Sequence, residues 1–226
     1  MKVTYYGHAC FGVEVTGKAL LFDPFITKNE LARSIDVKKI PADYILISHA
    51  HHDHIDDTEQ IASRTGATIV SNYEVTVWFG KKGLQKTHPM NHGGSHQFDF
   101  GKVKFVNALH SSSFPDGSYG GNPGGFVIES NHGNFYYSGD TALTLDMKLI
   151  GEAPPLNFAA LCIGDNFTMG VDGAIKAADF VSCKQVLGLH YNTFPPIKID
   201  EHAAVQKFAA SGKNLHLLAP GGTHEF

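Results

Sequence analysis

The segment Ile47–Asp57, with the sequence ISHAHHDHIDD, constrains the fold of this chain more than any other stretch. It contains four histidines and three aspartates, and it overlaps the end of the apolar run YILI. Imidazole and carboxylate groups are the ligands that borderline divalent cations prefer. Sites in α/β proteins lie beyond the carboxyl ends of strands. We therefore expect a sheet-based fold with a metal site at this turn, the alternative being a solvated polar turn.

The composition narrows the class of protein. The chain has 226 residues, of which 42% are hydrophobic, enough for one domain spanning residues 1–226. A net charge of −4 without basic runs argues against a nucleic-acid partner. Three cysteines without a C-x-x-C pair favour a reducing, cytoplasmic compartment. We find no signal-peptide pattern and no apolar run near the ~18 residues of a membrane span, so we expect a cytoplasmic protein acting on a small-molecule substrate.

Short apolar runs separated by turn residues predict a fold rich in strands. The expected strands cover residues 2–6, 10–15, 19–22, 44–48, 67–70, 102–109, 125–130, 134–140, 158–164, 185–190 and 215–221, with a hairpin across Asn131–Gly133. The expected helices cover 58–64 (Asp56 or Asp57 as N-cap, Gly66 as stop), 172–181 (Asp172 as cap) and 200–211 (Asp200 as N-cap, Gly212 as stop). Each half thus gives strands followed by helices, which indicates an α/β fold built as a four-layer αββα sandwich.

The histidine-rich turn offers more ligands than one ion needs. His49 pairs with His51, and Asp53 pairs with His54, if alternate side chains point into one cavity. Four ligands within six residues are too many for a tetrahedral ion that keeps an open position, so we expect two ions.

Three more candidate ligands each follow an apolar strand: His110 in FVNALHSSS, Asp140 in FYYSGDT and His190 in VLGLHYN. An ordinary, partly buried histidine is the alternative for each of the two histidines. Because these three residues accompany the histidine-rich cluster, we expect them to bind metal as well.

HAHHDH, at residues 49–54, matches the H-x-H-x-D-H motif of the metallo-β-lactamase superfamily, and the order His110, Asp140, His190 also resembles that superfamily. YYGHACFGVE, SSS and HYNTFPPI are similar to one bacterial branch of metal-dependent hydrolases, which includes ascorbate-6-phosphate lactonase and N-acyl-phosphatidylethanolamine phospholipase D. The resemblance spans essentially the whole chain and implies the αββα fold. It implies one metal at His49, His51 and His110, a second at Asp53, His54 and His190, and Asp140 bridging both. Zinc is the default cation, with manganese, iron or nickel as alternatives.

The resemblance and the ligand set together predict a hydrolase. A hydroxide held by two metal ions would cleave an ester-type bond, a lactone or a phosphodiester above all. Asp53 is the candidate general base, or it only ligates. His8 is the candidate substrate contact or proton shuttle, or it is a hydrogen-bonded turn residue. The alternative function is a non-catalytic or redox protein with two metals, either a diiron oxidoreductase or a metal sensor.

For several polar residues the sequence leaves alternative roles open. We expect His52 to face away from the metals, and Asp23 either to orient a ligand histidine or to cap a turn. Ser111–Ser113 line the substrate pocket or cap strand ends, and Tyr191–Thr193 contact the substrate or only pack. The loop 117–125 is a lid or a long turn. The histidines at 88, 92 and 96 belong to a solvated loop, contact substrate or bind an accessory metal. Edge strands could pair two copies into a homo-oligomer.

Overall fold

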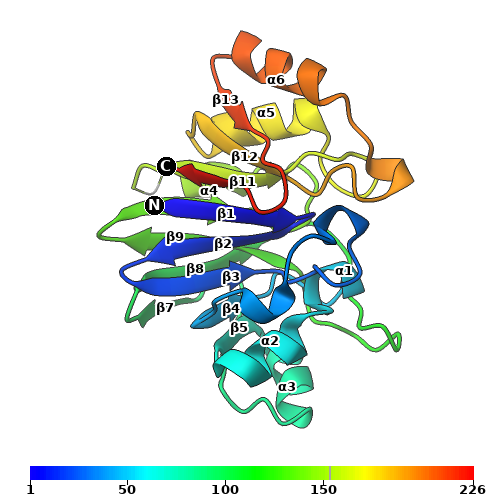
Figure 1. Cartoon of the computed structure of the whole chain (residues 1–226). Helices are drawn as coiled ribbons and strands as arrows, with labels where there is room; N and C mark the ends of the chain where they lie inside the picture. Colours follow the sequence, from blue (N-terminus) through cyan, green and yellow to red (C-terminus); the bar gives the residue numbers. More distant parts are fainter. Residues whose placement is uncertain (153) are drawn as a thin grey trace.

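The computed structural model describes residues 1–152 and 154–226, and within them the strands form two sheets of seven (Figure 1). The first sheet has, in spatial order, β14 (Thr223–Glu225), β1 (Lys2–Gly7), β2 (Cys10–Val15), β3 (Lys18–Phe22), β4 (Tyr44–Leu46), β5 (Thr68–Asn72) and β6 (Thr87–Met90). The second has β13 (Asn214–His216), β12 (Gln185–Leu189), β11 (Phe158–Cys162), β10 (Gly133–Tyr137), β9 (Gly124–Ser130), β8 (Gly101–Asn107) and β7 (Ser95–Phe98).

Helices cover the outer faces of both sheets (Figure 1). They are α1 (His52–Ile55), α2 (Thr58–Thr65), α3 (Tyr73–Lys81), α4 (Met147–Gly151), α5 (Val171–Phe180) and α6 (Glu201–Ala210), with 3-10 turns at Glu30–Ala32, Val37–Lys39 and Pro195–Ile197. Figure 1 shows α2 and α3 below the first sheet and α5 and α6 above the second. Every helix in this part of the chain is too short or too polar to cross a bilayer.

Three clusters of buried apolar side chains hold the sheets and helices together as layers. The central one lies between the sheets and is rich in aromatic rings, such as Phe11 stacked on Phe22 at 4.5 Å and Phe135 on Phe158 at 4.8 Å. The second lies between the first sheet and α2 and α3, and the third between the second sheet and α4, α5 and α6. Burying both faces of each sheet is the main favourable term in such a fold. The predicted αββα sandwich is confirmed.

Some local predictions are confirmed by capping geometry. The Asp200 carboxylate accepts the N–H of Ala203 at 3.0 Å, as an N-cap should. Gly66 ends α2 with a left-handed φ of 71°. The hairpin between β9 and β10 turns at Asn131–His132, close to the expected place.

The cap prediction for α5 is wrong, and the one for α2 is confirmed in position only. Gly170, not Asp172, is the N-cap of α5, and the Asp172 carboxylate instead binds Lys207 at 2.9 and 3.0 Å. Asp57 occupies the N-cap position of α2 but makes no capping bond. Its carboxylate accepts the backbone N–H groups of Ile26 and Thr27, because the preceding loop folds back over it.

The expected strand at 215–221 is also wrong. β13 ends at His216, and β14 lies in the other sheet, where it pairs with β1 in antiparallel fashion. Pro220 has no N–H for a ladder and Gly221 has a φ of 86°, so the chain turns between the two strands. The turn brings the termini together, and the Met1 ammonium donates to the Phe226 carbonyl at 2.7 Å.

Candidate metal centre

The candidate ligands meet at one end of the sandwich because the strands that carry them run in the same direction. β10 and β12 are each parallel to β11, and β8 is antiparallel to β9, which is antiparallel to β10. The chain leaving β8, β10 and β12 therefore reaches the same edge, with His110, Asp140 and His190. β4 of the facing sheet delivers the histidine-rich turn and α1 to this edge, on the right in Figure 1.

His49, His51 and His110 form the first ligand cluster. Each offers a nitrogen, and these atoms lie within 4.8 Å of one another. His49 Nε2 lies 2.9 Å from His51 Nδ1, and the ring centroids of His49 and His110 are 5.1 Å apart. His49 is fully buried, while the other two are partly exposed toward the cavity.

Asp53, His54 and His190 form the second cluster, together with His8. One ligand atom of each lies within 4.8 Å of the others. Asp53 and His54 are on α1, whose single turn directs both side chains into the site. His54 and His190 are buried, with their rings 5.7 Å apart and nearly parallel.

Asp140 lies between the two clusters. Its Oδ2 is 2.9 Å from His190 Nε2, 3.3 Å from His54 Nε2 and 3.7 Å from His110 Nε2. A carboxylate in this position can contact ions in both clusters. The structure thus brings all seven candidate ligands together in the expected grouping, and their assignment as metal ligands stays a prediction.

The donor set fits divalent cations. His54 Nε2 and Asp140 Oδ1 are buried and make no hydrogen bond. A buried polar atom without a partner costs roughly 1–3 kcal/mol, so such atoms usually have a ligand or a water. Imidazole nitrogens that face one another, such as those of His49 and His51, suit a shared cation better than a shared proton.

Asp23 orients His54 from behind the site. It follows β3 directly, is fully buried, and one of its oxygens lies 2.7 Å from His54 Nδ1. The same carboxylate accepts from the Ser48 N–H, the Ser48 hydroxyl and the Tyr137 hydroxyl. A proton held on Nδ1 leaves the Nε2 lone pair directed at the metal cluster. Of the two roles left open for Asp23, the geometry supports orientation of a ligand.

Ser48 and Tyr137 are contributors that the sequence did not single out. The Ser48 hydroxyl also lies 2.9 Å from His49 Nδ1, so one carboxylate positions two histidines. Burial, followed by the nearby charge of Asp23, raises the pKa of Tyr137, which therefore remains a donor. Tyr137 stands three residues before Asp140, and because Phe135, Tyr136 and Tyr137 are all buried, the pattern of β10 did not show that Tyr137 faces the site.

His8 links two loops beside the second cluster. Its Nε2 lies 3.1 Å from Asp53 Oδ2, and its Nδ1 lies 2.9 Å from the Thr193 hydroxyl. Burial and the charge of neighbouring His190 lower the pKa of His8 to about 3, so its ring is neutral. Burial opposes ionisation of Asp53, but the bond from His8 and the charge of His54 outweigh it and hold the pKa of Asp53 below its usual value.

Four of the histidines outside the two clusters were candidates from the sequence. His52 is exposed at the cavity rim, and its Nδ1 is 3.9 Å from Asp56. The rings of His88 and His96 lie 4.1 Å apart on the edge strands β6 and β7. His92 stacks on Phe105 and its Nε2 bonds to the Pro123 carbonyl at 2.9 Å. Within the described part of the chain, none of these four belongs to a group of three metal-binding side chains.

A cavity of about 450 Å³ opens onto the clusters, within the range usual for small-molecule sites. Its lining consists of His51, His52, Asp53, His110, Ser111, Asp140, Phe167, His190, Phe194 and Pro196. Ser111 lies 3.4 Å from His51 Nε2.

The 117–125 loop is held beside the cavity. The Gly120 carbonyl accepts from the Ser112 hydroxyl at 3.0 Å and from the Asn72 amide at 2.9 Å. Ser112 in turn accepts the Ala50 N–H from the histidine-rich turn. A Cβ at Gly120 would collide with Ala50 and Ser112. This anchoring favours a packed turn over a lid.

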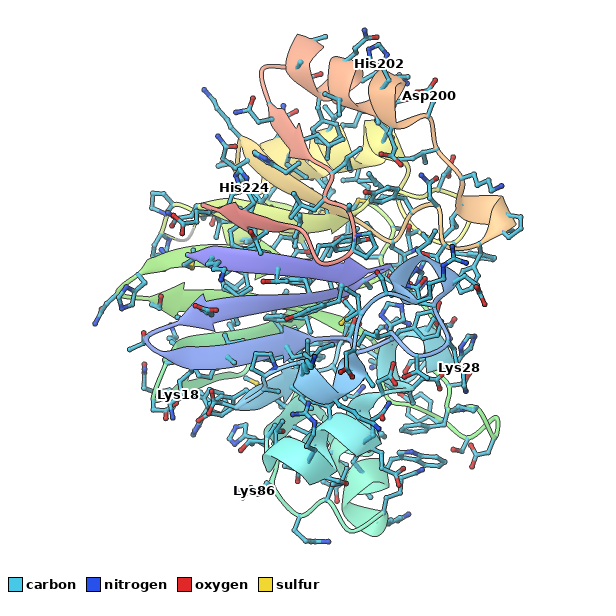
Figure 2. All side chains as sticks on the ribbon, in the orientation of Figure 1. Lys18, Lys28, Lys86, Asp200, His202 and His224 are labelled. Carbon is cyan, nitrogen blue, oxygen red and sulfur yellow. The ribbon has the colours of Figure 1, made fainter. Side chains whose placement is uncertain are left out.

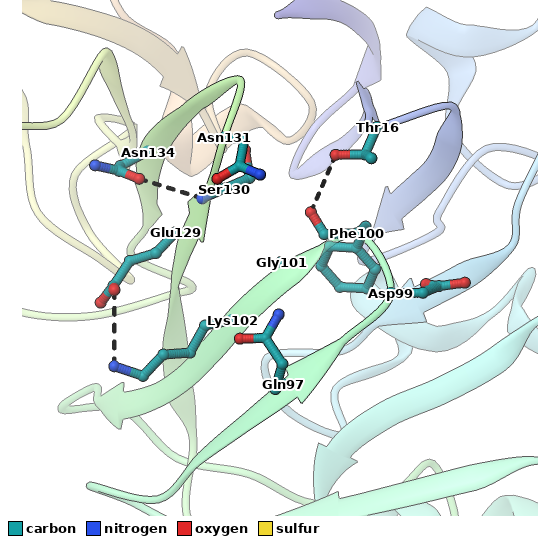
Figure 3. A pocket seen from close by; sticks show the side chains of 10 residues that line it. All are labelled: Thr16, Gln97, Asp99, Phe100, Gly101, Lys102, Glu129, Ser130, Asn131 and Asn134. Atoms are coloured by element: carbon teal, nitrogen blue, oxygen red, sulfur yellow. Dashed lines mark hydrogen bonds and ion pairs between the residues drawn. The ribbon is translucent and has the colours of Figure 1, made fainter.

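A second cavity, of about 400 Å³, lies at the opposite end of the strands, where β8 begins (Figure 3). Figure 3 shows Lys102 directed at Glu129, 3.7 Å away, and Thr16 at the Phe100 carbonyl, 3.3 Å away. Its polar groups are largely satisfied by one another, and it contains none of the candidate ligands.

Known proteins match this chain in sequence and in fold. The Beta-lactamase superfamily domain matches residues 2–190. A UPF0173 metal-dependent hydrolase of Flavobacterium johnsoniae is 57% identical over 225 residues, and one of Christiangramia forsetii is 54% identical over 226, with all of each chain covered. The structure of Igni18, a metallo hydrolase from the archaeon Ignicoccus hospitalis, superposes with a TM-score of 0.89 at 36% identity, covering 100% of this chain and 98% of the other.

Proposed function

The chain belongs to the metallo-β-lactamase superfamily, and from this premise we propose that it is a metal-dependent hydrolase with two divalent cations that cleaves an ester-type bond in a small molecule. A lactone or a phosphodiester is the substrate bond we favour. The observation that carries the proposal is the pair of imidazole clusters with the Asp140 carboxylate between them, at the base of an open cavity. The name metal-dependent hydrolase, carried by relatives that match over their full length, supports it.

In this proposal His49, His51 and His110 would hold one cation, Asp53, His54 and His190 would hold the other, and Asp140, between the two clusters, would be a ligand as well. Zinc is the expected metal, and manganese, iron or nickel suit the same ligands. When bound, such a pair of cations lowers the pKa of water and polarises the bond under attack.

Asp53 is the proposed proton acceptor. It is ionised at neutral pH, it lines the cavity, and its Oδ2 is held by His8. Because an ionised carboxylate only accepts hydrogen bonds, His8 Nε2 carries the proton of this pair. His8 Nδ1 is then free to accept from the Thr193 hydroxyl at 2.9 Å. His8 is therefore a positioning residue that fixes the carboxylate relative to the substrate.

We further propose that residues 1–226 act as one hydrolase domain in the cytoplasm. Cys10, Cys162 and Cys183 are all free and buried, which suits a reducing compartment. The cavity holds a small molecule rather than a polymer.

Elemental analysis of the purified protein, paired with turnover of bis(p-nitrophenyl) phosphate and a simple lactone, tests the proposal. We expect about two metals per chain and turnover that depends on added zinc or manganese. His51→Ala and Asp140→Ala should each lose metal and activity, whereas the exposed residue His52 should tolerate alanine. Two bound metals without turnover would favour the sensor or redox alternative, and loss of metal in His52→Ala would contradict the ligand assignment.

A further inference from the structure

The cavity over the clusters has two chemically different walls. His51, His110 and Ser111 form a polar wall beside the first cluster. Phe167, Phe194 and Pro196 line the cavity as well, and these three side chains have no polar group. A substrate whose scissile bond lies at the metals gains binding free energy if it also covers this apolar surface.

Phe167 is exposed, on a turn whose backbone is anchored. Its side chain is 53% exposed, on a turn whose preceding residues Asp165 and Asn166 have left-handed φ values of 62° and 55°. The turn is closed by a bridge between Gly164 and Gly170. Its Met169 N–H donates to the Thr141 carbonyl at 2.9 Å, next to Asp140.

Gly164, at the other end of this turn, packs against the backbone of His190, where a Cβ would collide with the carbonyl. The turn is thus tied to the chain segments of two candidate ligands, Asp140 and His190. The anchored turn fixes the backbone of Phe167 relative to these two residues, as a specificity wall requires.

Phe194 continues the wall from a second loop. Its ring lies edge-on to His8 at 5.4 Å and 6.3 Å from Phe25. The loop is closed by the Asn192 N–H, which donates to the Ile197 carbonyl at 2.8 Å. Because Phe194 also supports His8, Phe167 is the cleaner position for a test.

Away from the proposed metals, the described part of the cavity offers no lysine or arginine to an anionic substituent. Its lining within the described residues contains no lysine or arginine, while Asp53 and Asp140 contribute carboxylates. Lys28 lies beside α1 (Figure 2), but its Nζ is 3.0 Å from Asp56 and its charge is already paired. A phosphate or carboxylate group held away from the metals would therefore meet apolar surface and no cationic side chain of the described lining.

We propose that this site takes a neutral ester or lactone whose non-reacting part is an apolar chain or ring packed against Phe167 and Phe194. The inference rests on the proposed hydrolase function and narrows its substrate class. A phosphorylated lactone or a substrate with a free terminal carboxylate is disfavoured.

A lactone series tests the inference: γ-butyrolactone and its methyl through hexyl derivatives, with a parallel series ending in phosphate. For the metal-loaded protein we expect kcat/KM to rise roughly 2- to 4-fold per added methylene in the neutral series, since burying one methylene is worth about that factor. The phosphate series should be poorer at every length. Phe167→Ala should lower kcat/KM for the hexyl lactone roughly 10-fold, mainly through KM, and Phe167→Leu should restore most of it.

Two control variants and one binding measurement separate the outcomes. Leu149 on α4 is 65% exposed and outside the cavity, so Leu149→Ala should behave as the wild type. Lys28→Ala should keep the preference for neutral chains. Calorimetric titration with the product hydroxy acids should show the same chain-length trend and its loss in Phe167→Ala.

A trend in product binding without turnover of any lactone would contradict the hydrolase proposal and support the apolar wall. Turnover and binding that do not depend on chain length would overturn the inference and leave the hydrolase proposal standing. A preference for the phosphate series that Lys28→Ala abolishes would overturn it in the same way.

Discussion

Asp23→Asn is the substitution that best tests how the site is supported. One carboxylate oxygen accepts from three donors, which are His54 Nδ1 at 2.7 Å and the hydroxyls of Ser48 and Tyr137, and the other accepts the Ser48 N–H at 2.7 Å. An asparagine has the same shape but one oxygen. Whichever way its amide is oriented, the NH2 group faces at least one donor.

The magnitude follows from these bonds. Losing a buried hydrogen bond to a charged group costs about 1.5–3 kcal/mol, so we expect the free energy of unfolding of the metal-free protein to fall by at least about 2 kcal/mol. The orientation in which the amide NH2 faces His54 also favours the ring tautomer with its proton on Nε2, the atom directed at the metals. Partners of this kind typically contribute about 10- to 100-fold in metal affinity, and we expect a loss in that range.

Competition with a chromophoric chelator measures the affinity, and urea unfolding of the metal-free form measures the stability. Tyr137→Phe is the matched control, because it removes one donor and leaves the contact between Asp23 and His54. It should change metal affinity by less than a few-fold. A folded Asp23→Asn protein with wild-type metal affinity would refute the role assigned to this carboxylate.

Three further outcomes are expected. His8→Ala should lower kcat roughly 10-fold or more with metal content unchanged by elemental analysis, because His8 positions Asp53 and is not itself assigned as a ligand; loss of metal would make it a ligand instead. Chelation should lower the Tm by roughly 5–10 °C in a thermal scan, since ligand at about 100 Kd is worth about 2.7 kcal/mol; an unchanged Tm would count against bound metal. Burial and the nearby charge of His224 lower the pKa of His216 below its ordinary value of 6.5. As the pH falls, this histidine is therefore protonated in the unfolded chain before it is protonated in the folded chain. The folding stability that is present above pH 6.5 is lost below it. His216→Gln should reduce the fall in urea midpoint from about pH 7 to about pH 5, and an equal fall in both proteins would contradict this.

The strands that carry the ligands could be predicted because their signal is local. A buried run such as β12 ends directly before a polar residue, so burial and chemistry are both visible within a few positions. α3 could not be predicted in this way. Its sequence, YEVTVWFGK, contains Val75, Thr76 and Val77, which favour strands. The helix forms because Asn72 accepts the Val75 N–H and because Val75 and Phe79 are buried against the sheet.

The cluster of candidate ligands could be predicted from the sequence, whereas the residues that orient those ligands could not, because only the first signal is local. Four of the seven candidate ligands lie within six residues, so their chemistry is visible in one segment. The partners of Asp23, by contrast, are Ser48, 25 positions away, and Tyr137, 114 positions away. Nothing in the local sequence connects them, because only the packing of one sheet on the other brings β10 against the end of β3.

One backbone conformation recurs where the strands deliver residues to the site. β1, β3 and β12 are each followed directly by a residue with left-handed φ: His8 at 58°, Asp23 at 41° and His190 at 56°. This conformation bends the chain out of the extended path, so that a polar side chain leaves the strand at the end of the sandwich. It costs about 1–3 kcal/mol at each such residue, a substantial part of the 5–15 kcal/mol by which domains are stable. The His190 N–H donates to the His8 carbonyl at 2.9 Å, so two of the strained residues hold one another. Thr16, directly after β2, has the same conformation, with a φ of 52°, in the turn at the other end of the strands, so the conformation alone does not mark a site. Three of the four described strand ends that share it lie beside the two clusters, where the strain accompanies side chains that the site uses.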